Sequence, residues 1–402
     1  MSAPPPQSPE NFWLFKHLNE EPFGILPLHN LTSKGGPTGL KNIQRLASYS
    51  WYLEETAAPV VVVPGAPREY VYWPGGKLKP DQGVLMYDVN HIKLPKYPVD
   101  PVILVTKMFA ESAGQPTPDF QKYDLVTDTL NLQKLFAFCV GGNEGLFRID
   151  FERVGNTVVA LRCESSDLME VDYECYDYGM KAKASKGNSS LTEGPHFIIS
   201  EAQFGSMRML LRTETDCADY TRLPGWKPPE KNAPRYDPAE EEKCKEALGQ
   251  KRRFLRDELG IGDYPLSFVP YGVINPHHLQ VITTYPAGRG FPFYTWAQLF
   301  FSGLESVMVG WWKPGGDFAR PAQYALADIN KLMKPLPFAA ISKVHDCLVK
   351  ISDFLKKSEP DAKMALIWRG KEHLEIFEKV DGDDNAISDQ VREMLQEQVP
   401  SE

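Results

Sequence analysis

Two carboxylates in one strand-like run are the clearest candidates for chemistry in this sequence. Glu214 and Asp216 lie in the run Met207–Cys217, which we expect to be a strand. Because side chains alternate along a strand, both point to the same face, about 7 Å apart. Such a pair can bind a divalent cation, which activates water for attack on a phosphodiester. The alternative is a solvent-facing acidic pair on an edge strand, and the spacing alone favours that alternative.

Three other features each have a functional and a plainer interpretation. The basic run at 251–256 could contact RNA phosphates, but it follows Glu240–Glu242, so charge pairing on a solvated helix face is favoured. Trp311 and Trp312 could stack on bases, yet packing within a strand is favoured. The pair His277-His278 lacks the partners and spacing of a metal site.

Composition limits the function classes. The 402 residues are 42% hydrophobic and 24% charged, which is ordinary for a globular protein. The net charge is −9, so RNA could be contacted only by a local basic patch, and no feature of the sequence indicates DNA binding. No apolar segment approaches the roughly 20 residues of a membrane span, and the N-terminus lacks the features of a secretory signal. Six cysteines without a CxxC pair are typical of a reducing compartment. We therefore expect an intracellular protein, cytoplasmic or nuclear, that is neither secreted nor bound to a membrane.

The elements that must position the carboxylates follow from periodicity and from turn residues. We expect helices at 100–113, from Thr127 to about 140, and at 239–258, 295–301, 322–334, 338–357 and 388–397. We expect strands at 60–63, 69–73, 146–154, 157–162, 196–204, 207–217, 277–284, 307–312, 363–368 and 373–380. The strands at 196–204, 207–217 and 277–284 should share one sheet, beside the short helix at 295–301.

The order of three motifs resembles that of a known family. Asp124-Leu125-Val126-Thr127 precedes a helix, Glu214-x-Asp216 lies on a strand, and the run at 295–303, TWAQLFFSG, precedes an apolar strand. In this order they resemble the DXO family of RNA 5′-end decapping and quality-control nucleases, especially a fungal branch, over about residues 45–380. The resemblance implies a mixed α+β fold with a two-sheet nuclease core of the PD-(D/E)xK type, flanked by helices.

The resemblance also shows where the catalytic residues of the family have been replaced. The family has an Arg where this chain has Thr129, and its Gly-x-x-x-Glu motif corresponds to the stretch at 179–184, which offers only Lys183 or Ala182. Its Glu-x-Lys strand corresponds to Gln280 and Ile282. What remains is the carboxylate pair and Gln298, which resembles an RNA-contacting Gln of the family. We expect Glu214, Asp216, Gln280 and Gln298 to converge in one cleft, with Lys183 at its rim.

These replacements indicate an impaired site. Loss of two of four carboxylates removes much of the attraction for Mg²⁺, and loss of one stabilising group raises a barrier by about 2–4 kcal/mol. We interpret the chain as a DXO-like protein without useful catalysis that acts by binding RNA 5′ ends or a protein partner, with no cofactor. The alternative is an active RNA decapping hydrolase or 5′–3′ exoribonuclease that uses Glu214 and Asp216 with Mg²⁺ or Mn²⁺.

The expected domain organisation is simple. Residues 1–15 should form a disordered N-terminus, residues 16–380 a single domain, and residues 381–402 an acidic tail. A charged insertion at 222–262 interrupts the domain.

Overall fold

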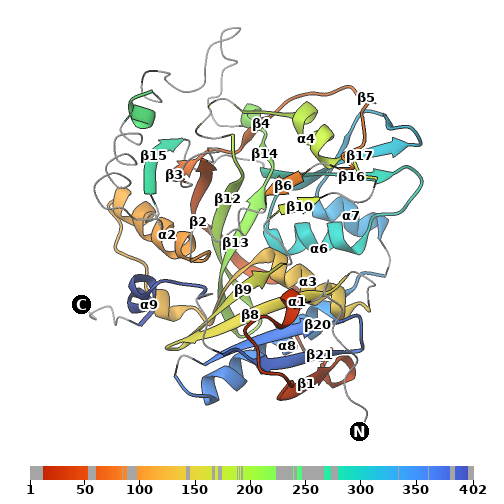
Figure 1. Ribbon diagram of the computed structural model, residues 1–402. Helices are drawn as coiled ribbons and strands as arrows, with labels where there is room; N and C mark the ends of the chain where they lie inside the picture. The colour runs from red at the N-terminus through yellow and green to blue at the C-terminus, as the bar shows by residue number, and fades with distance from the viewer. Residues whose placement is uncertain are drawn as a thin grey trace.

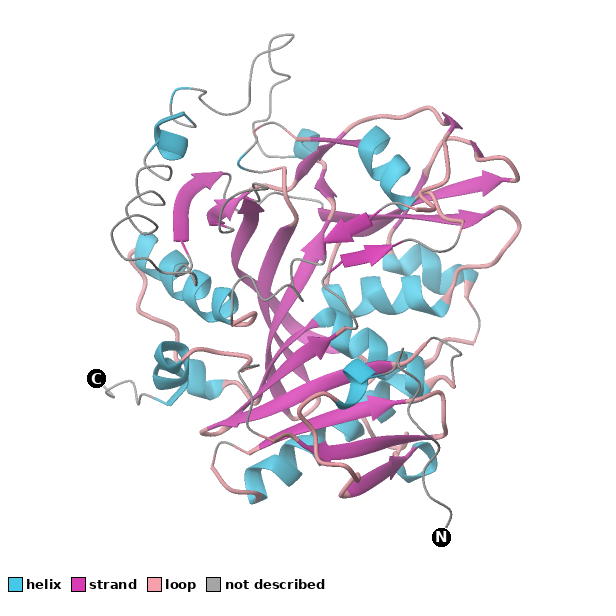
Figure 2. Ribbon diagram, in the orientation of Figure 1, coloured by secondary structure: helices cyan, strands magenta, loops and turns pink. Residues whose placement is uncertain are grey.

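The computed structural model contains two large mixed sheets with helices packed between and around them (Figures 1 and 2). It describes residues 12–52, 60–83, 85–87, 97–141, 145–164, 168–170, 174–187, 189, 191, 193–222, 239, 242–246, 267–272, 279–333, 335–360, 362–380 and 385–396. The basic run at 251–256 and the pair His277-His278 lie outside these ranges. No helix within them has both the length and the apolar content needed to cross a membrane.

The first sheet has eleven strands. In spatial order they are β1 (Gly24–Pro27), β21 (His373–Glu378), β20 (Lys363–Trp368), β8 (Phe147–Val154), β9 (Thr157–Cys163), β7 (Leu125–Asp128), β13 (Met207–Thr215), β12 (His196–Phe204), β2 (Leu40–Tyr52), β3 (Val60–Gly65) and β15 (Ser267–Gly272). Strands β12 and β13 form an antiparallel hairpin, and β13 runs parallel to β7. This register places Arg212 beside Asp128 and Glu214 beside Phe197.

The second sheet has eight strands, and a two-stranded sheet completes the β structure. The second sheet comprises β11 (Ser185–Lys186), β4 (Arg68–Tyr70), β14 (Cys217–Ala218), β16 (Leu279–Pro286), β17 (Ser306–Lys313), β18 (Asp317–Phe318) and β5 (Gly76–Lys77), with β19 (Ala322–Tyr324) paired to β17. The small sheet pairs β6 (Leu85–Tyr87) with β10 (Leu168–Glu170). The chain passes from the first large sheet to the second at Asp216, the residue between β13 and β14.

Helices fill the space beside these sheets. They are α1 (Phe12–Phe15), α2 (Asp100–Ser112), α3 (Thr129–Cys139), α4 (Asp177–Ala184), α6 (Phe293–Ser302), α7 (Leu326–Leu332), α8 (Phe338–Lys357) and α9 (Asp389–Gln396). The apolar positions of α8 recur every three or four residues, at Ile341, Val344, Leu348, Ile351 and Leu355, and all are buried. They join α3 and α6 in the main core, whereas α2 and α9 cover the opposite face of the first sheet (Figure 1).

The mixed α and β class and the two-sheet architecture are confirmed, and most of the expected elements are present. Several bounds differ by a few residues, as for the strand expected at 207–217, which ends at Thr215, and two differences change the type of element. The helix expected from Thr127 begins at Thr129, because Leu125–Asp128 form β7 between β9 and β13. The helix expected at 322–334 is divided into β19 and the shorter α7.

The expectation that three strands share one sheet was also wrong. Strands β12 and β13 belong to the first sheet, whereas β16 belongs to the second. The physical reason is the change of sheet at Asp216: the two residues of β14, not β13, pair with β16.

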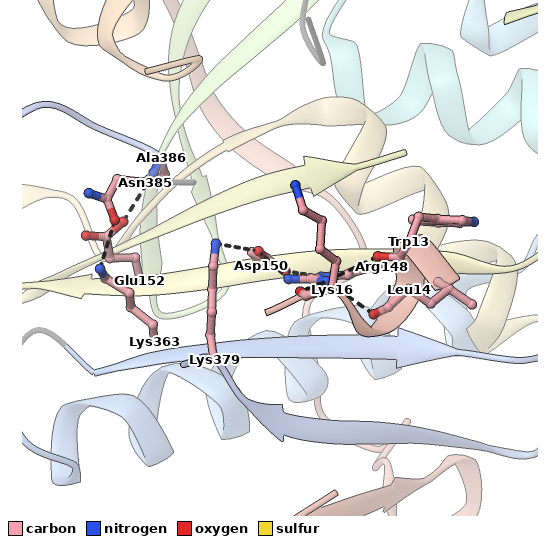
Figure 3. A network of polar contacts seen from close by, with 10 residues as sticks. All are labelled: Trp13, Leu14, Lys16, Arg148, Asp150, Glu152, Lys363, Lys379, Asn385 and Ala386. Atoms are coloured by element: carbon pink, nitrogen blue, oxygen red, sulfur yellow. Dashed lines mark hydrogen bonds and ion pairs between the residues drawn. The ribbon is translucent and has the colours of Figure 1, made fainter. Parts of the chain in front are cut away.

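A buried network of charges anchors both ends of the described chain to β8 (Figure 3). Arg148 donates to the backbone carbonyls of Trp13, Leu14 and Lys16 and to both oxygens of Asp150. Near the other end, Glu152 accepts from the Ala386 amide and pairs with Arg392 of α9. The helix expected at 388–397 is present as α9, and it packs against the domain with Val391 and Leu395 buried.

Candidate functional site

Asp216 has strong partners at both of its carboxylate oxygens. The Lys181 ammonium lies 2.7 Å from Oδ1, and the backbone N–H of Ile282 donates to Oδ2 at 2.7 Å. The Asp216 amide in turn donates to the Gln280 carbonyl at 3.0 Å, so its backbone is fixed as well. Only 11% of the Asp216 side chain is exposed. Both oxygens are thus engaged by groups of the protein itself.

Lys181 is held between two carboxylates. Burial lowers the pKa of its ammonium, but the negative charges of Asp216 and then Glu214 outweigh this effect, so the pKa is raised. The ring of Tyr178 lies one turn earlier on the same helix, with its centroid 5.7 Å from the ammonium. Lys181 is therefore a stable cation in the position where these two carboxylates meet.

Glu214 is the more open of the two carboxylates. Its side chain is exposed, and its charge acts on Lys181, Tyr178 and Tyr49. Burial, opposed by Lys181 and reinforced by Glu214, raises the pKa of Tyr178 to about 12, so that phenol remains neutral. The charges of Glu214 and Asp216 thus both act on the ammonium of Lys181, and Asp216 contacts it directly.

The N-terminal turn of α4 is anchored by two further carboxylates. Asp81 accepts from the backbone amides of Tyr178 at 2.8 Å and Gly179 at 3.1 Å, which helix geometry would otherwise leave unpaired. Asp177 accepts from the Thr284 amide of β16 at 2.6 Å. Burial, together with the nearby Asp216, raises the pKa of Asp177 despite this bond and the charge of Lys181. These contacts fix the helix that carries Lys181.

The two substituted positions on β16, Gln280 and Ile282, carry uncharged side chains. Ile282 is 2% exposed and packs in an apolar cluster with Met180, Cys217 and Met308. Gln280 is fully buried, and neither polar atom of its side-chain amide has a protein hydrogen-bond partner within the described ranges. Neither residue supplies a charge to the carboxylates.

A second cation reaches this region but is fully engaged. Arg212 is two residues before Glu214 and pairs with both oxygens of Asp128, at 2.5 and 2.9 Å. It also donates to the Pro98 carbonyl and to the Tyr49 hydroxyl. Thr129, where the related family has an Arg, is a buried residue at the start of α3 next to Asp128. Arg212 is thus a structural ion-pair partner with no surface left for a ligand.

The other predicted residues lie elsewhere. Lys183 is exposed on α4, two residues after Lys181, and its position at the rim of the site stays a prediction. Gln298 is half-buried on α6, and the structure gives it no polar contact with Glu214 or Asp216. Sequence reasoning missed Lys181, although a signal existed. Met180 and Ala184 mark the buried face of α4, and Lys181 follows Asp177 by one turn.

The donor set does not fit the Mg²⁺ or Mn²⁺ that the family resemblance implies. Such ions favour octahedral sites of about six oxygen ligands, mostly from carboxylates and water. Within the described ranges, no three His, Cys, Asp or Glu side chains gather closely enough to hold a metal. The two carboxylates that do gather already share an ammonium.

A hollow of about 1000 Å³ lies at another part of the molecule and contains none of the predicted residues. Its walls come from α8, β20, β21 and α9, and its lining includes Lys363, Lys379 and Asn385, which Figure 3 labels. The charged groups along it are largely paired, as in the Lys379–Asp150 ion pair and the bond from Lys363 to Asn385.

Sequence comparison matches part of the chain to a family model. A family model described as a domain of unknown function, DUF8563, matches residues 34–228. No curated protein matches the sequence.

Structural comparison is more informative. The chain is similar to S. pombe Rai1 with a TM-score of 0.54 at 14% identity, covering 89% of this chain and 99% of that one. For S. stipitis Rai1, in complex with (3′-NADP)⁺ and calcium ion, the TM-score is 0.57 at 12% identity, over 93% of this chain and all of that one. For C. albicans Rai1, in complex with pU5-Mn²⁺, it is 0.51 at 13% identity, over 93% and 98% of the two chains. The chain therefore has the DXO-like fold of the Rai1 structures, as the order of its motifs predicts.

Proposed function

We propose that this protein binds the 5′ end of RNA and does not hydrolyse it. The observation that carries the proposal is the state of Asp216, whose two oxygens are taken by Lys181 and by the Ile282 amide. A hydrolase of this fold would need those oxygens for a metal ion, and a charged group at position 282 to stabilise the developing negative charge. Ile282 carries no charge, so its side chain cannot stabilise the developing negative charge.

The ligand class is suggested by what proteins of the same fold hold. C. albicans Rai1 binds pU5, and S. pombe Rai1 binds 3′-FADP. Both ligands combine phosphate with nucleotide bases. RNA occurs in the cytoplasm and the nucleus, and the six cysteines, none of which forms a disulfide, are typical of a reducing compartment. We therefore place the protein inside the cell.

Tyr178 is the side chain on which we expect a base to stack. It is 37% exposed, and it lies beside Lys181 and near Glu214. Base stacking on an aromatic ring contributes about 1–3 kcal/mol. Lys183, exposed on the same helix, and Lys186, exposed on β11, would add positive charge near an RNA backbone. Gln298 remains a predicted RNA contact.

The test is the binding of fluorescently labelled RNA. It is measured by fluorescence anisotropy in a buffer with EDTA, which removes divalent metal ions. Wild-type protein should bind an oligonucleotide with a 5′ phosphate more tightly than the same oligonucleotide with a 5′ hydroxyl. Tyr178→Ala should weaken binding by roughly 5- to 160-fold, the equivalent of one stacked base. Tyr72→Ala is the matched control, because Tyr72 is 59% exposed and lies against Arg320 outside the site. Absence of saturable binding, or equal losses in both variants, would overturn the proposal.

A further inference from the structure

The Lys181 ammonium is placed as a bound cation would be, not as a surface ion pair. It contacts Asp216 Oδ1 at 2.7 Å, and the charge of Glu214 also acts on it. The exposed fractions of the two paired side chains are 31% for Lys181 and 11% for Asp216. A pair this enclosed is screened much less than an exposed one.

The position of that ammonium is imposed by the packing of α4. Met180, the residue before it, is fully buried against β17, where Gly310 leaves room for it. A Cβ at Gly310 would lie 2.3 Å from the Met180 sulfur, so helix and strand are in close contact. The Asp81 bonds at the start of α4 and the bond from Thr284 to Asp177 fix the same helix. Lys181 is therefore directed at Asp216 by the fold itself.

Removal of the ammonium would leave oxygen ligands of the kind that divalent cations prefer. Asp216 Oδ1 would lose its only charged partner among the resolved contacts, and the positive charge on which Glu214 acts would be gone. Asp177 adds further negative potential, since its charge acts on the same group of residues. Two carboxylates completed by water are a known way to bind Mg²⁺-like ions.

We propose that Lys181 is the resident cation of this site, standing in place of a divalent ion, and that its removal opens a Mn²⁺ site at Glu214 and Asp216. A built-in ammonium excludes a metal ion in two ways, because it occupies the carboxylate oxygen and repels a second cation. The site of the wild-type protein is thus insensitive to divalent metals. This inference goes beyond RNA binding and is tested without RNA.

The experiment is titration of Mn²⁺ into the full chain, followed by calorimetry and by the electron paramagnetic resonance signal of free Mn²⁺. Lys181→Met keeps the length of the side chain and removes the charge, while Lys183→Ala is the control on the exposed side of the same helix. We expect one equivalent of Mn²⁺ to bind Lys181→Met at least tenfold more tightly than wild type or Lys183→Ala. Adding Asp216→Asn to Lys181→Met should abolish the gain.

Two results would overturn the inference. One is wild-type protein that binds one Mn²⁺ as tightly as Lys181→Met. The other is a folded Lys181→Met protein, verified by a cooperative thermal transition, whose affinity equals that of Lys183→Ala. Because Lys181→Ala deletes the side chain without filling its space, it serves as a second variant and should show the same gain.

Discussion

The ammonium of Lys181 lies 2.7 Å from Oδ1 of Asp216, and this contact joins α4 to the point where the chain changes sheets. The charge of Glu214, the other carboxylate of the strand motif, acts on the same ammonium. Because Lys181 is part of the chain, its ammonium cannot leave the protein as a bound metal ion can. The net charge of the site therefore depends on residues of the chain and not on the concentration of metal ions.

Replacement of the resident cation by a carboxylate, with charged groups added on β16, should create a metal site. The variant Lys181→Glu, Gln280→Glu and Ile282→Lys exchanges the resident cation for a carboxylate and supplies the two charged groups missing from β16. We expect its Mn²⁺ affinity to exceed that of Lys181→Glu alone by at least tenfold, because carboxylates around one ion act as a set. Calorimetric titration checks this, and an affinity no greater than that of the single variant would contradict it.

Arg212 and Asp128 should behave as a buried structural pair. Arg212→Met leaves the Asp128 carboxylate without its bidentate partner, which should lower the free energy of unfolding by about 3–5 kcal/mol. Adding Asp128→Leu removes the unpaired charge, so the double variant should be more stable than Arg212→Met. Urea denaturation monitored by circular dichroism measures both. A single variant within 1 kcal/mol of wild type, on the order of a surface substitution, would contradict a structural role.

The buried charge network in Figure 3 should make the free energy of unfolding decrease at low pH. Burial raises the pKa of Asp150, but Lys379 and Arg148 outweigh it, so the pKa is lowered in the folded state. The stabilisation is present above the unfolded pKa, near 3.8, and is lost as the pH falls through the lower folded value. Thermal melts of wild type below pH 4 should therefore decline more steeply than those of Asp150→Asn. Parallel curves would show that the Asp150 charge does not contribute.

Asp100 should have the opposite pH dependence. Burial raises its pKa to about 6, although the Ser388 side chain and amide lower it. The folded state therefore binds the proton more tightly, and stability falls as the pH rises from about 4 through 6. Asp100→Asn keeps an oxygen that can accept from the Ser388 amide, so it should remove this decline and stabilise the protein at pH 8. Chemical denaturation at pH 5 and pH 8 checks the sign, and an unchanged decline in Asp100→Asn would contradict it.

Elements with local signals were predictable from the sequence. Helix α8 matches its expected range because its apolar residues recur at helical spacing over 20 residues. The hairpin of β12 and β13 follows from alternation on both sides of Gly205, which adopts a φ of +61° at the turn. Thr127 and Asp128 were misassigned because a strand of four residues leaves too short a pattern to distinguish it from a helix start.

The candidate site was only partly predictable. Alternation on a strand was enough to select Glu214 and Asp216, but it carried no information on what lies opposite them. The ion pair with Lys181 depends on a contact between α4 and the crossing at Asp216, 35 residues away in sequence, and on packing of Met180 against Gly310. Tertiary structure determines such a contact. Without it, the sequence does not indicate whether Lys181 or Lys183 pairs with Asp216.

The most direct test of the account is hydrolysis of RNA by the purified protein. Capped RNA and 5′-phosphorylated RNA are each incubated with Mg²⁺ or Mn²⁺, with Glu214→Ala prepared in parallel to reveal contaminating nucleases. The account predicts that wild type releases no cap nucleotide and degrades 5′-phosphorylated RNA no faster than Glu214→Ala. Sustained turnover by wild type that is abolished in Glu214→Ala would contradict it and establish the protein as an active hydrolase.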